Sequence, residues 1–330
     1  MPWNYPFYQV ARLAAPNLIL GNTILLKHSR NVPQAALMQE QLFIEAGLPK
    51  GVYTNLFAKS QQIADIVIPA PTIAGISLTG SERAGAAVAK VAGEHLKKVV
   101  LELGGADPFL VLDDKNIQGT IATAVRGRLG NGGQACTSAK RFVVLDSVYD
   151  TFLEGFAKGM EAIQPSDPTQ ESTFLGPLSS VEARDEVVAQ VQRAVEEGAT
   201  LVTGGTPMEE PGAWMQPAVL ADVTPDMQAY SEEIFGPVAV VHRASDVEEA
   251  IAIANDSPYG LGAAVFGSDE ELNNDVASKL EAGMVFINEN TDTAPDLPFG
   301  GVKRSGIGRE LGSYGIQEFA NVKLIHHRGA

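Results

Sequence analysis

The chain has 330 residues, of which 45% are hydrophobic, and a formal net charge of −16 at pH 7. This length can form two domains, and the hydrophobic content is that of a globular protein. The negative charge argues against nucleic acid or an anionic membrane as a partner, because phosphates would be repelled over most of the surface. The single cysteine excludes an internal disulfide, and neither a secretory leader nor a membrane-spanning segment is recognisable, so we expect a cytoplasmic protein.

Strand-like and helix-like segments alternate from Asn22 to Leu103, which is typical of a parallel sheet with crossover helices. The expected strands are residues 23–27, 52–57, 74–79 and 98–103. A helix is predicted over residues 33–46, because Pro33 stands near its start and Gly47 just after its end. The turn from Gly80 to Gly85 leads into an alanine-rich helix that Ser81 can cap. Such a helix start attracts phosphate, although a plain capped turn explains the segment equally well.

The same alternation begins again after Gly105 and predicts a second domain of the α/β class. The expected elements are strands near 109–112, 141–145 and 284–288, and helices near 117–129, 183–197, 245–255 and 269–282. Ser245 and Glu248 are expected to form a capping box. We divide the chain into a partial Rossmann-type dinucleotide-binding domain (1–104), a catalytic domain (105–304), and a C-terminal return segment with an oligomerisation strand (305–330).

Cys136 and Glu102 are the candidate catalytic pair. A thiolate is nucleophilic enough to add to a carbonyl carbon, and a nearby carboxylate can activate the thiol or a water. Glycines beside both residues suit a site where backbone approaches a ligand closely. The alternative is a buried core cysteine and a solvent-facing glutamate at a strand end.

Five ordered blocks of sequence resemble the motifs of the aldehyde dehydrogenase superfamily. They are Pro2-Trp3-Asn4-Tyr5-Pro6, Glu102-Leu103-Gly104-Gly105, Gly133-Gln134-Ala135-Cys136, Glu232-Glu233-Ile234-Phe235-Gly236-Pro237 and Gly308-Arg309-Glu310. The resemblance runs from the first residues to the last. It implies an aldehyde dehydrogenase-like α/β fold and the NAD(P)-dependent oxidation of an aldehyde.

The resemblance also implies a role for each catalytic residue. Cys136 would attack the aldehyde, and the Asn4 side-chain amide with the Cys136 backbone amide would form the oxyanion hole. Glu102 would act as general base on the water that hydrolyses the thioester. Glu310 would support a proton path, or it is simply a charge on a helix surface.

For the cofactor, the resemblance implies that Lys27 contacts the adenosine ribose or its phosphate. Gly51 would line the adenine pocket, Ser81 would cap the pyrophosphate, and Glu233 and Phe235 would hold the nicotinamide riboside. The remaining expected cofactor residues are Trp3, Ser29, Arg30, Gly80, Gly85 and Leu103. Arg30 stands where NAD-preferring members often carry a glutamate, so NADP and NAD are both open.

Among family members, the chain is most like the bacterial succinate-semialdehyde dehydrogenase branch, through Leu25-Leu26-Lys27-His28 and Ala106-Asp107-Pro108-Phe109. Arg12 matches an arginine that grips the distal carboxylate of the substrate, which implies a small carboxylated aldehyde. Its alternative role is a charge on a helix surface. A second arginine of that branch is replaced by Gly130, and Arg128 is an open substitute.

Family members are substantially longer, so the chain is either a fragment or a natural short form. We expect it, taken alone, to expose apolar surface and to be poorly soluble or weakly active. A homo-oligomer is implied for the full-length form. No metal-ligand spacing is visible, so no metal is expected. Two other functions stay open: a thioester or ester hydrolase that uses the cysteine, and a catalytically weak remnant with an interaction role.

Overall fold

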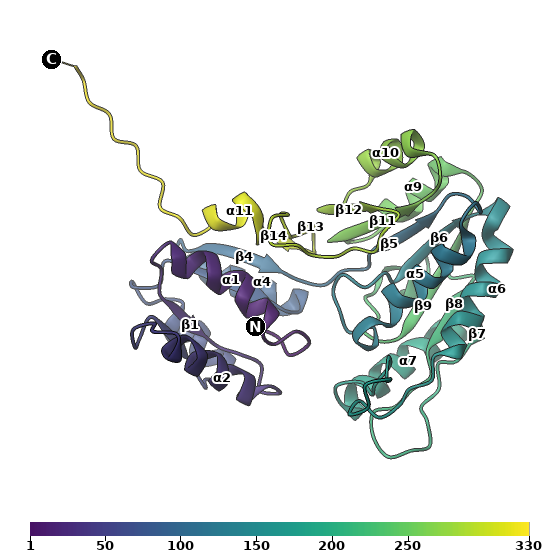
Figure 1. Cartoon of the computed structure of the whole chain (residues 1–330), viewed down its shortest axis with the longest axis horizontal. Coiled ribbons are helices and arrows are strands. Elements are labelled where there is room, and N and C mark those ends of the chain that lie inside the picture. Colours follow the sequence, from purple (N-terminus) through teal and green to yellow (C-terminus); the bar gives the residue numbers. More distant parts are fainter. Residues whose placement is uncertain (330) are drawn as a thin grey trace. The chain divides into compact units, whose positions relative to one another are not determined.

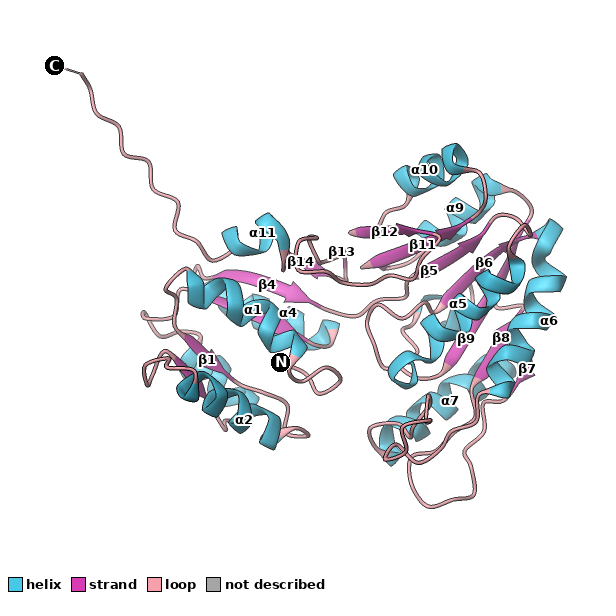
Figure 2. Cartoon of the chain, viewed as in Figure 1, coloured by secondary structure: helices cyan, strands magenta, loops and turns pink. Residues whose placement is uncertain are grey.

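The computed structural model describes residues 1–329, which separate into two compact units. Unit 1 contains Met1–Leu103, Thr293–Gly300 and the residues from Ile307 onward, and unit 2 contains Gly104–Asp292 and Gly301–Gly306. Figure 1 traces the chain through both units, and Figure 2 shows that each one combines helices with strands. The segment Thr293–Gly300, which the sequence analysis placed in the catalytic domain, is part of unit 1.

Unit 1 is built from short parallel strands and the helices between them. Its elements are α1 (Tyr8–Ile19), β1 (Ile24–Leu26), α2 (Pro33–Glu45), β2 (Tyr53–Asn55), α3 (Ser60–Gln62), a π-helical turn (Ile63–Val67), β3 (Gly75–Thr79), α4 (Glu82–Glu94), β4 (Lys98–Glu102) and α11 (Gly312–Gln317). The short strand β14 (Gly306–Ile307) lies where the chain passes between the units for the last time. All four strands expected in this part are present, each shorter by one to three residues.

The strands form two separate sheets, β1-β2 and β14-β4-β3, instead of the single sheet that the sequence predicts. Ile24 of β1 lies opposite Tyr53 of β2, and Gly75 of β3 lies opposite Lys98 of β4. No strand joins β1 to β3 among residues 1–329, so each has one edge without a ladder partner. Alternation along the sequence indicates the strands and their direction, but it does not determine which strand edges meet.

Helix α4 packs closely on the end of β4. A Cβ atom added at Gly85 would lie 2.6 Å from a side-chain carbon of Leu103, so only glycine permits this approach. The side chain of Ser81 accepts a hydrogen bond from the Ala84 amide at 3.3 Å, which confirms the predicted helix cap. The strand, the turn and the helix therefore have the close packing of a dinucleotide-binding unit.

Unit 2 contains a larger sheet whose strands follow the order β12-β11-β5-β6-β9-β8-β7. The strands are β5 (Pro108–Val111), β6 (Arg141–Leu145), β7 (Thr200–Thr203), β8 (Ala218–Ala221), β9 (Val238–Ala244), β11 (Gly262–Phe266) and β12 (Met284–Ile287). The helices are α5 (Ile117–Leu129), α6 (Asp146–Ala162), α7 (Val181–Glu197), α8 (Gln228–Ser231), α9 (Val247–Asn255) and α10 (Glu270–Lys279). All neighbours are parallel except β7 and β8, and a separate antiparallel pair joins β10 (Tyr259–Gly260) to β13 (Val302–Lys303).

Successive residues of β5 enter cores on opposite faces of this sheet. Phe109 packs in a cluster with residues of α5 and α6, whereas Leu110 packs in a cluster with residues of α9 and α10. A strand covered on both faces needs apolar residues at every position, which explains why β5 is a continuous hydrophobic run. Figure 2 shows the helices of unit 2 surrounding the long central strands.

The sequence prediction for the start of one helix is wrong. The helix α9 is capped by Asp246, whose side chain accepts from the Glu249 amide at 2.9 Å, while Glu249 in turn binds the Ser245 amide at 2.7 Å. The predicted capping box is thus shifted by one residue, because aspartate is as good a cap as serine. Residues 321–329, which contain the expected oligomerisation strand, have no regular secondary structure in this chain, and the strand in an oligomer stays a prediction. A strand needs a partner edge, which a single chain does not supply there.

Within residues 1–329, none of the helices combines the length and the apolar character that crossing a membrane requires.

The contact between Gly85 and Leu103 predicts opposite effects for two substitutions in one helix. Gly85→Ala forces a methyl group into the Leu103 side chain and should destabilise the protein by about 1–3 kcal/mol. Gly93→Ala in the same helix meets nothing within 4 Å and should stabilise it by about 0.5–1 kcal/mol, because alanine is the better helix former. Urea unfolding of both variants measures the difference. Equal effects would show that α4 does not pack on β4 in this way.

Candidate active site

In unit 2, Cys136 lies in a loop between a short 3-10 turn (Gly130–Gly133) and β6. The turn contains three residues in the left-handed region, Asn131, Gly132 and Gly133, with φ values of 53°, 65° and 70°. A side chain at Gly133 would collide with the carbonyl of Gly236, so glycine is required there. The cysteine itself is half-buried and is the free thiol of the chain.

The side chain of Arg128 stabilises the loop that contains Cys136. It is fully buried, and its guanidinium donates to the carbonyls of Ala139 at 3.1 Å, Ile234 at 3.2 Å and Gly133 at 3.3 Å, and also to Gly236. Burial lowers the pKa of Arg128 to about 9. The two terminal nitrogens of Arg128 donate to backbone carbonyls of two segments, so this side chain supports the fold of unit 2.

The two expected nicotinamide residues follow directly in the segment that Arg128 secures. Glu233 accepts a hydrogen bond from the Gly105 amide at 3.1 Å and lies 3.4 Å from the ammonium of Lys140. Phe235 is half-buried, and its ring centroid is 6.0 Å from the same ammonium. Cys136 lies on one segment of unit 2, and Glu233 and Phe235 lie on another. The buried cations Arg128 and Lys140 contact both segments.

Unit 1 contains a buried cluster around Glu102. Glu102 is 1% exposed at the end of β4, Glu310 is 3% exposed, and Arg12 of α1 is 5% exposed. The Arg12 Nε atom lies 2.8 Å from a carboxylate oxygen of Glu310. These positions exclude the surface alternatives considered for all three residues. The expected base, the expected supporting carboxylate and the expected substrate arginine thus form one cluster.

The backbone fixes the two carboxyl groups in this cluster. Glu310 exchanges two hydrogen bonds of 2.7 Å with the backbone of Phe299, and the ring of Phe299 lies 4.0 Å below the Arg12 guanidinium. Gly300 faces Glu102, since a Cβ atom there would be 2.8 Å from a Glu102 carboxylate oxygen. The guanidinium is therefore held by an aromatic ring and a carboxylate at once.

Burial dominates the acidity of both carboxyl groups. Desolvation raises the pKa of Glu102 well above its usual range, and the Glu310 carboxylate raises it further, whereas Arg12 and Arg309 lower it. Desolvation also raises the pKa of Glu310, against the effect of its Arg12 partner. A carboxyl group whose pKa moves toward neutral pH suits a general base.

Asn4, the expected oxyanion donor, is half-buried in unit 1. Its side-chain oxygen accepts a hydrogen bond from the Gln9 amide at 3.1 Å. This bond fixes the orientation of the Asn4 amide through its oxygen, so the NH₂ group that an oxyanion would need points away from Gln9.

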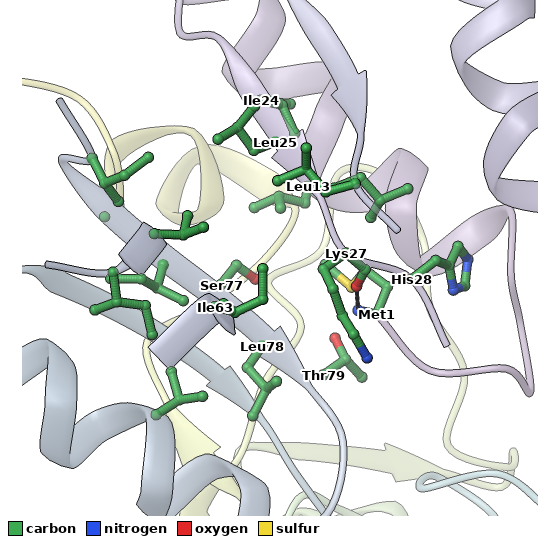
Figure 3. A pocket seen from close by; sticks show the side chains of 18 of the residues that line it. Met1, Leu13, Ile24, Leu25, Lys27, His28, Ile63, Ser77, Leu78 and Thr79 are labelled. Carbon is green, nitrogen blue, oxygen red and sulfur yellow. Dashed lines mark hydrogen bonds between the residues drawn. The ribbon is translucent and has the colours of Figure 1, made fainter. Parts of the chain in front are cut away.

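A cavity of about 2270 Å³ in unit 1 lies between β1 and β3. Figure 3 shows Ile24 and Leu25 on one side of it and Leu78 on the other, with Lys27 and Thr79 toward one end. Much of its lining is apolar. Its polar end lies at the carboxyl ends of the two parallel strands, where dinucleotides bind in open α/β sheets.

Several expected cofactor residues line or adjoin this polar end. Those that line the cavity are Trp3, Lys27, Ser29, Arg30 and Gly80. Ser81 is the exposed cap of α4, and Gly85 and Leu103 contribute the packing of α4 on β4 described above. Gly51 is exposed, with a φ of 87°. Two cationic side chains and the start of α4 together suit a phosphate-bearing dinucleotide.

Met1 extends the hydrogen-bonding pattern of β1 at the same end. Its amine donates to the Lys27 carbonyl at 3.0 Å, and its carbonyl accepts from the Ser29 amide at 2.9 Å, which is the pattern of a parallel bridge. Burial lowers the pKa of the Met1 amine to about 5.

The model of the aldehyde dehydrogenase family matches residues 1–325. The chain belongs to the aldehyde dehydrogenase family. The resemblance noted from five motifs is thereby confirmed, and the fold of both units is the aldehyde dehydrogenase fold.

Individual relatives support the same family. A succinate-semialdehyde dehydrogenase [NADP(+)] of Deinococcus radiodurans is 59% identical over 326 residues, covering 98% of this chain and 68% of the relative. An enzyme of the same name from Mycobacterium ulcerans is 46% identical over 325 residues, covering 98% of this chain and 71% of the relative. The crystal structure of succinic semialdehyde dehydrogenase from Streptococcus pyogenes in complex with NADP+ superposes with a TM-score of 0.97 at 45% identity, covering 99% of this chain and 72% of that one.

In this aldehyde dehydrogenase the histidines are engaged in structural contacts or exposed. The ring of His28 bonds the Pro6 carbonyl at 2.9 Å and accepts from the Ser29 amide at 2.8 Å, so both nitrogens are used. His242 packs edge-on against Tyr230, and burial lowers its pKa to about 3. His95, His326 and His327 are exposed. A cysteine hydrolase that relies on a histidine base gains no support from these positions.

Sequence reasoning missed Lys140 and left Arg128 open. Both are long cationic side chains within four to eight residues of Cys136, and both are buried. Buried cations need partners, so a lysine directly before the apolar strand β6 is the signal that could have indicated Lys140.

The carboxyl cluster predicts a shift in the pH dependence of the enzyme. Glu310→Gln removes a negative charge that raises the pKa of Glu102 and leaves Arg12 without its carboxylate partner. Both changes favour ionised Glu102, so the acidic limb of the kcat/KM profile should move to lower pH. Glu45→Gln, at an exposed site of α2, is the control and should leave the profile unchanged. A shift of the acidic limb of the Glu310→Gln variant to higher pH would contradict the proposed effect of Glu310 on Glu102.

Proposed function

We propose that this chain oxidises succinate semialdehyde to succinate with NADP as the hydride acceptor. The observation that carries the proposal is the buried cluster of unit 1, in which a carboxyl group of raised pKa, Glu102, shares its surroundings with an arginine, Arg12. The cluster combines a base for hydrolysis with a cation for a substrate carboxylate. The names of two similar relatives support the same substrate and cofactor.

The reaction begins at Cys136. Its thiolate adds to the carbonyl carbon of the aldehyde, and the carbonyl oxygen becomes an oxyanion that accepts hydrogen bonds from the Asn4 side chain and the Cys136 backbone amide. A nicotinamide dinucleotide, when bound, would supply the acceptor for the hydride of this carbon, and Cys136 would then carry the thioester. One such oxyanion donor is typically worth about 2.7–4 kcal/mol of barrier.

Hydrolysis of the thioester depends on Glu102. Its carboxylate removes a proton from a water, and the water oxygen attacks the thioester carbon. The carbon–sulfur bond then breaks, and the acid product leaves while Cys136 returns as a thiolate. Burial raises the pKa of Glu102, and the negative charge of Glu310 raises it further, which favours proton uptake by this base.

The choice of NADP rests on charge at the polar end of the cavity. Lys27, Ser29 and Arg30 offer two cations and a hydroxyl, and position 30 carries no carboxylate that would repel a 2′-phosphate. A guanidinium binds a phosphate through two parallel hydrogen bonds, which a lysine alone does not provide.

The substrate carboxylate is assigned to Arg12. In this structure the guanidinium is paired with Glu310 and stacked on Phe299, and a guanidinium has five N–H donors, more than one carboxylate can use. Arg12 therefore holds Glu310 and still has donors for a second carboxylate. A homo-oligomer is proposed as well, because Val322, Leu324 and Ile325 expose apolar side chains along the C-terminal segment.

The central test is the formation of reduced nicotinamide from succinate semialdehyde, followed by absorbance with NADP and with NAD. Cys136→Ser should abolish it. Glu102→Gln should retain a single burst equal to the enzyme concentration and lose about 10²–10⁴-fold in steady state, because thioester formation does not need the base. Production of acid without any reduced nicotinamide would instead indicate the hydrolase, and silence of the folded protein in both assays would refute the proposal.

The assignment of Arg12 predicts a split between two substrates. Arg12→Gln should raise KM about 10- to 100-fold for succinate semialdehyde, since a hydrogen bond to a charged group contributes about 1.5–3 kcal/mol. For propanal, which has no carboxylate, KM should change less than about threefold by the same reasoning. Thermal unfolding of the variant controls for damage to the buried cluster. An equal loss with both aldehydes would show that Arg12 acts only through Glu310.

A further inference from the structure

Lys140 is a buried ammonium that the proposed mechanism does not use. The residue is 3% exposed, and its Nζ atom donates to the carbonyls of Ala135 at 2.9 Å, Cys136 at 3.0 Å and Ser138 at 3.3 Å. An ammonium has three N–H donors, so these three carbonyls can use all of them. Backbone carbonyls of the loop that contains Cys136 thus surround the charge of Lys140.

The same ammonium faces a second functional segment. Its Nζ atom is 3.4 Å from Glu233 Oε1, which also accepts the Gly105 amide at 3.1 Å. The side chain of Lys140 therefore connects the cysteine loop to the residue expected at the nicotinamide ribose. An uncharged side chain of similar length at position 140 would not form the ion pair with Glu233, and this link between the two segments would be lost.

The charged and titratable groups that face Lys140 come from four segments of unit 2. They are Glu233, Arg128, Asp107 and Cys136. Asp107 is fully buried before β5, and desolvation raises its pKa to about 6, while its carbonyl accepts the Lys140 backbone amide at 3.1 Å. Arg128 directs its donors to other carbonyls. Lys140 is therefore the cation that lies between Glu233, Asp107 and the cysteine.

The unfavourable free energy of burying the Lys140 ammonium indicates a role for its charge. Burial of an ammonium is unfavourable by several kcal/mol unless hydrogen bonds and opposite charges compensate it. Here three carbonyl dipoles and one carboxylate supply that compensation. A positive charge at this position lowers the free energy of negative charge on its neighbours, which include the sulfur of Cys136.

We propose that Lys140 is a positioning residue of the cysteine chemistry, whose ammonium fixes the loop Ala135–Ser138, orients Glu233 and favours the thiolate form of Cys136. This inference deepens the proposed function and rests on it for the use of the thiolate. It assigns a second cation, beside Arg128, to the support of the nucleophile.

Alkylation of Cys136 by iodoacetamide tests the proposal without aldehyde or cofactor. The chain has one cysteine, so the reaction reports on this thiol alone. Lys140→Met should lower the second-order rate at pH 7 about tenfold, while rates of variant and parent converge within about twofold at a pH where both thiols are ionised. Lys140→Arg keeps the charge and should stay within about threefold of the parent at pH 7.

Arg141→Met is the matched control. Arg141 follows Lys140 directly, is equally buried and also donates to backbone carbonyls, namely those of Ile253, Ala254 and Asp256. Its loss should lower stability and leave the alkylation profile unchanged. Thermal unfolding of each variant verifies the fold, and Lys140→Gln, which retains a donor but no charge, replaces Lys140→Met if the latter does not fold.

Three results would overturn the proposal. They are a folded neutral variant with the parental rate at pH 7, an equal loss in Arg141→Met, and an equal loss in Lys140→Arg. Failure of the proposed function is distinguishable from each of them. If the parent forms no reduced nicotinamide from any aldehyde but the alkylation rates differ as expected, the function is refuted while the role of Lys140 stands.

Discussion

The geometry of unit 2 near the nucleophile depends on the guanidinium of Arg128. It joins the carbonyls of Gly133 and Ala139, on either side of Cys136, to those of Ile234 and Gly236 in another segment. Loops with left-handed residues have few regular backbone hydrogen bonds, so their carbonyls need other donors when buried. A single arginine satisfies these carbonyls and so allows a glycine-rich loop to be rigid. The half-buried thiol, Glu233 and Phe235 are held in place through this one side chain and through Lys140.

Unit 1 also contains buried charged groups, here two carboxyl groups and one guanidinium. Glu102 and Glu310 are both removed from water, and Arg12 is paired with one of them. Two buried carboxylates with one cation are not stable in fully ionised form, and the raised pKa of each expresses this. The negative charge of Glu310 makes ionisation of Glu102 less favourable, in addition to the effect of burial. The arrangement that is unfavourable for stability is thus useful for a base that must accept a proton and release it again.

Local features of the sequence predicted most elements well. The helix Ile117–Leu129 and the strand Arg141–Leu145 were predicted with the bounds that the structure shows, and the Ser81 cap is confirmed. These features depend on residues within a few positions of one another. The shifted cap at Asp246 and the division of the unit 1 strands into two sheets were not predicted, since each is decided by a choice between partners of equal local quality.

The motifs around Cys136, Glu102 and Glu310 were sufficient to indicate the family, because the residue types that carry out a reaction occur in short, recognisable runs of sequence. Only the tertiary structure showed that Arg12 pairs with Glu310, that Arg128 is an internal support, and that Lys140 connects the cysteine loop to Glu233. A buried charge takes its partner from whichever segment folding brings within a few ångströms, and the separation along the chain has no bearing on that distance. The sequence therefore indicates which residue types can carry out the reaction, whereas the folded chain determines which buried charges form pairs.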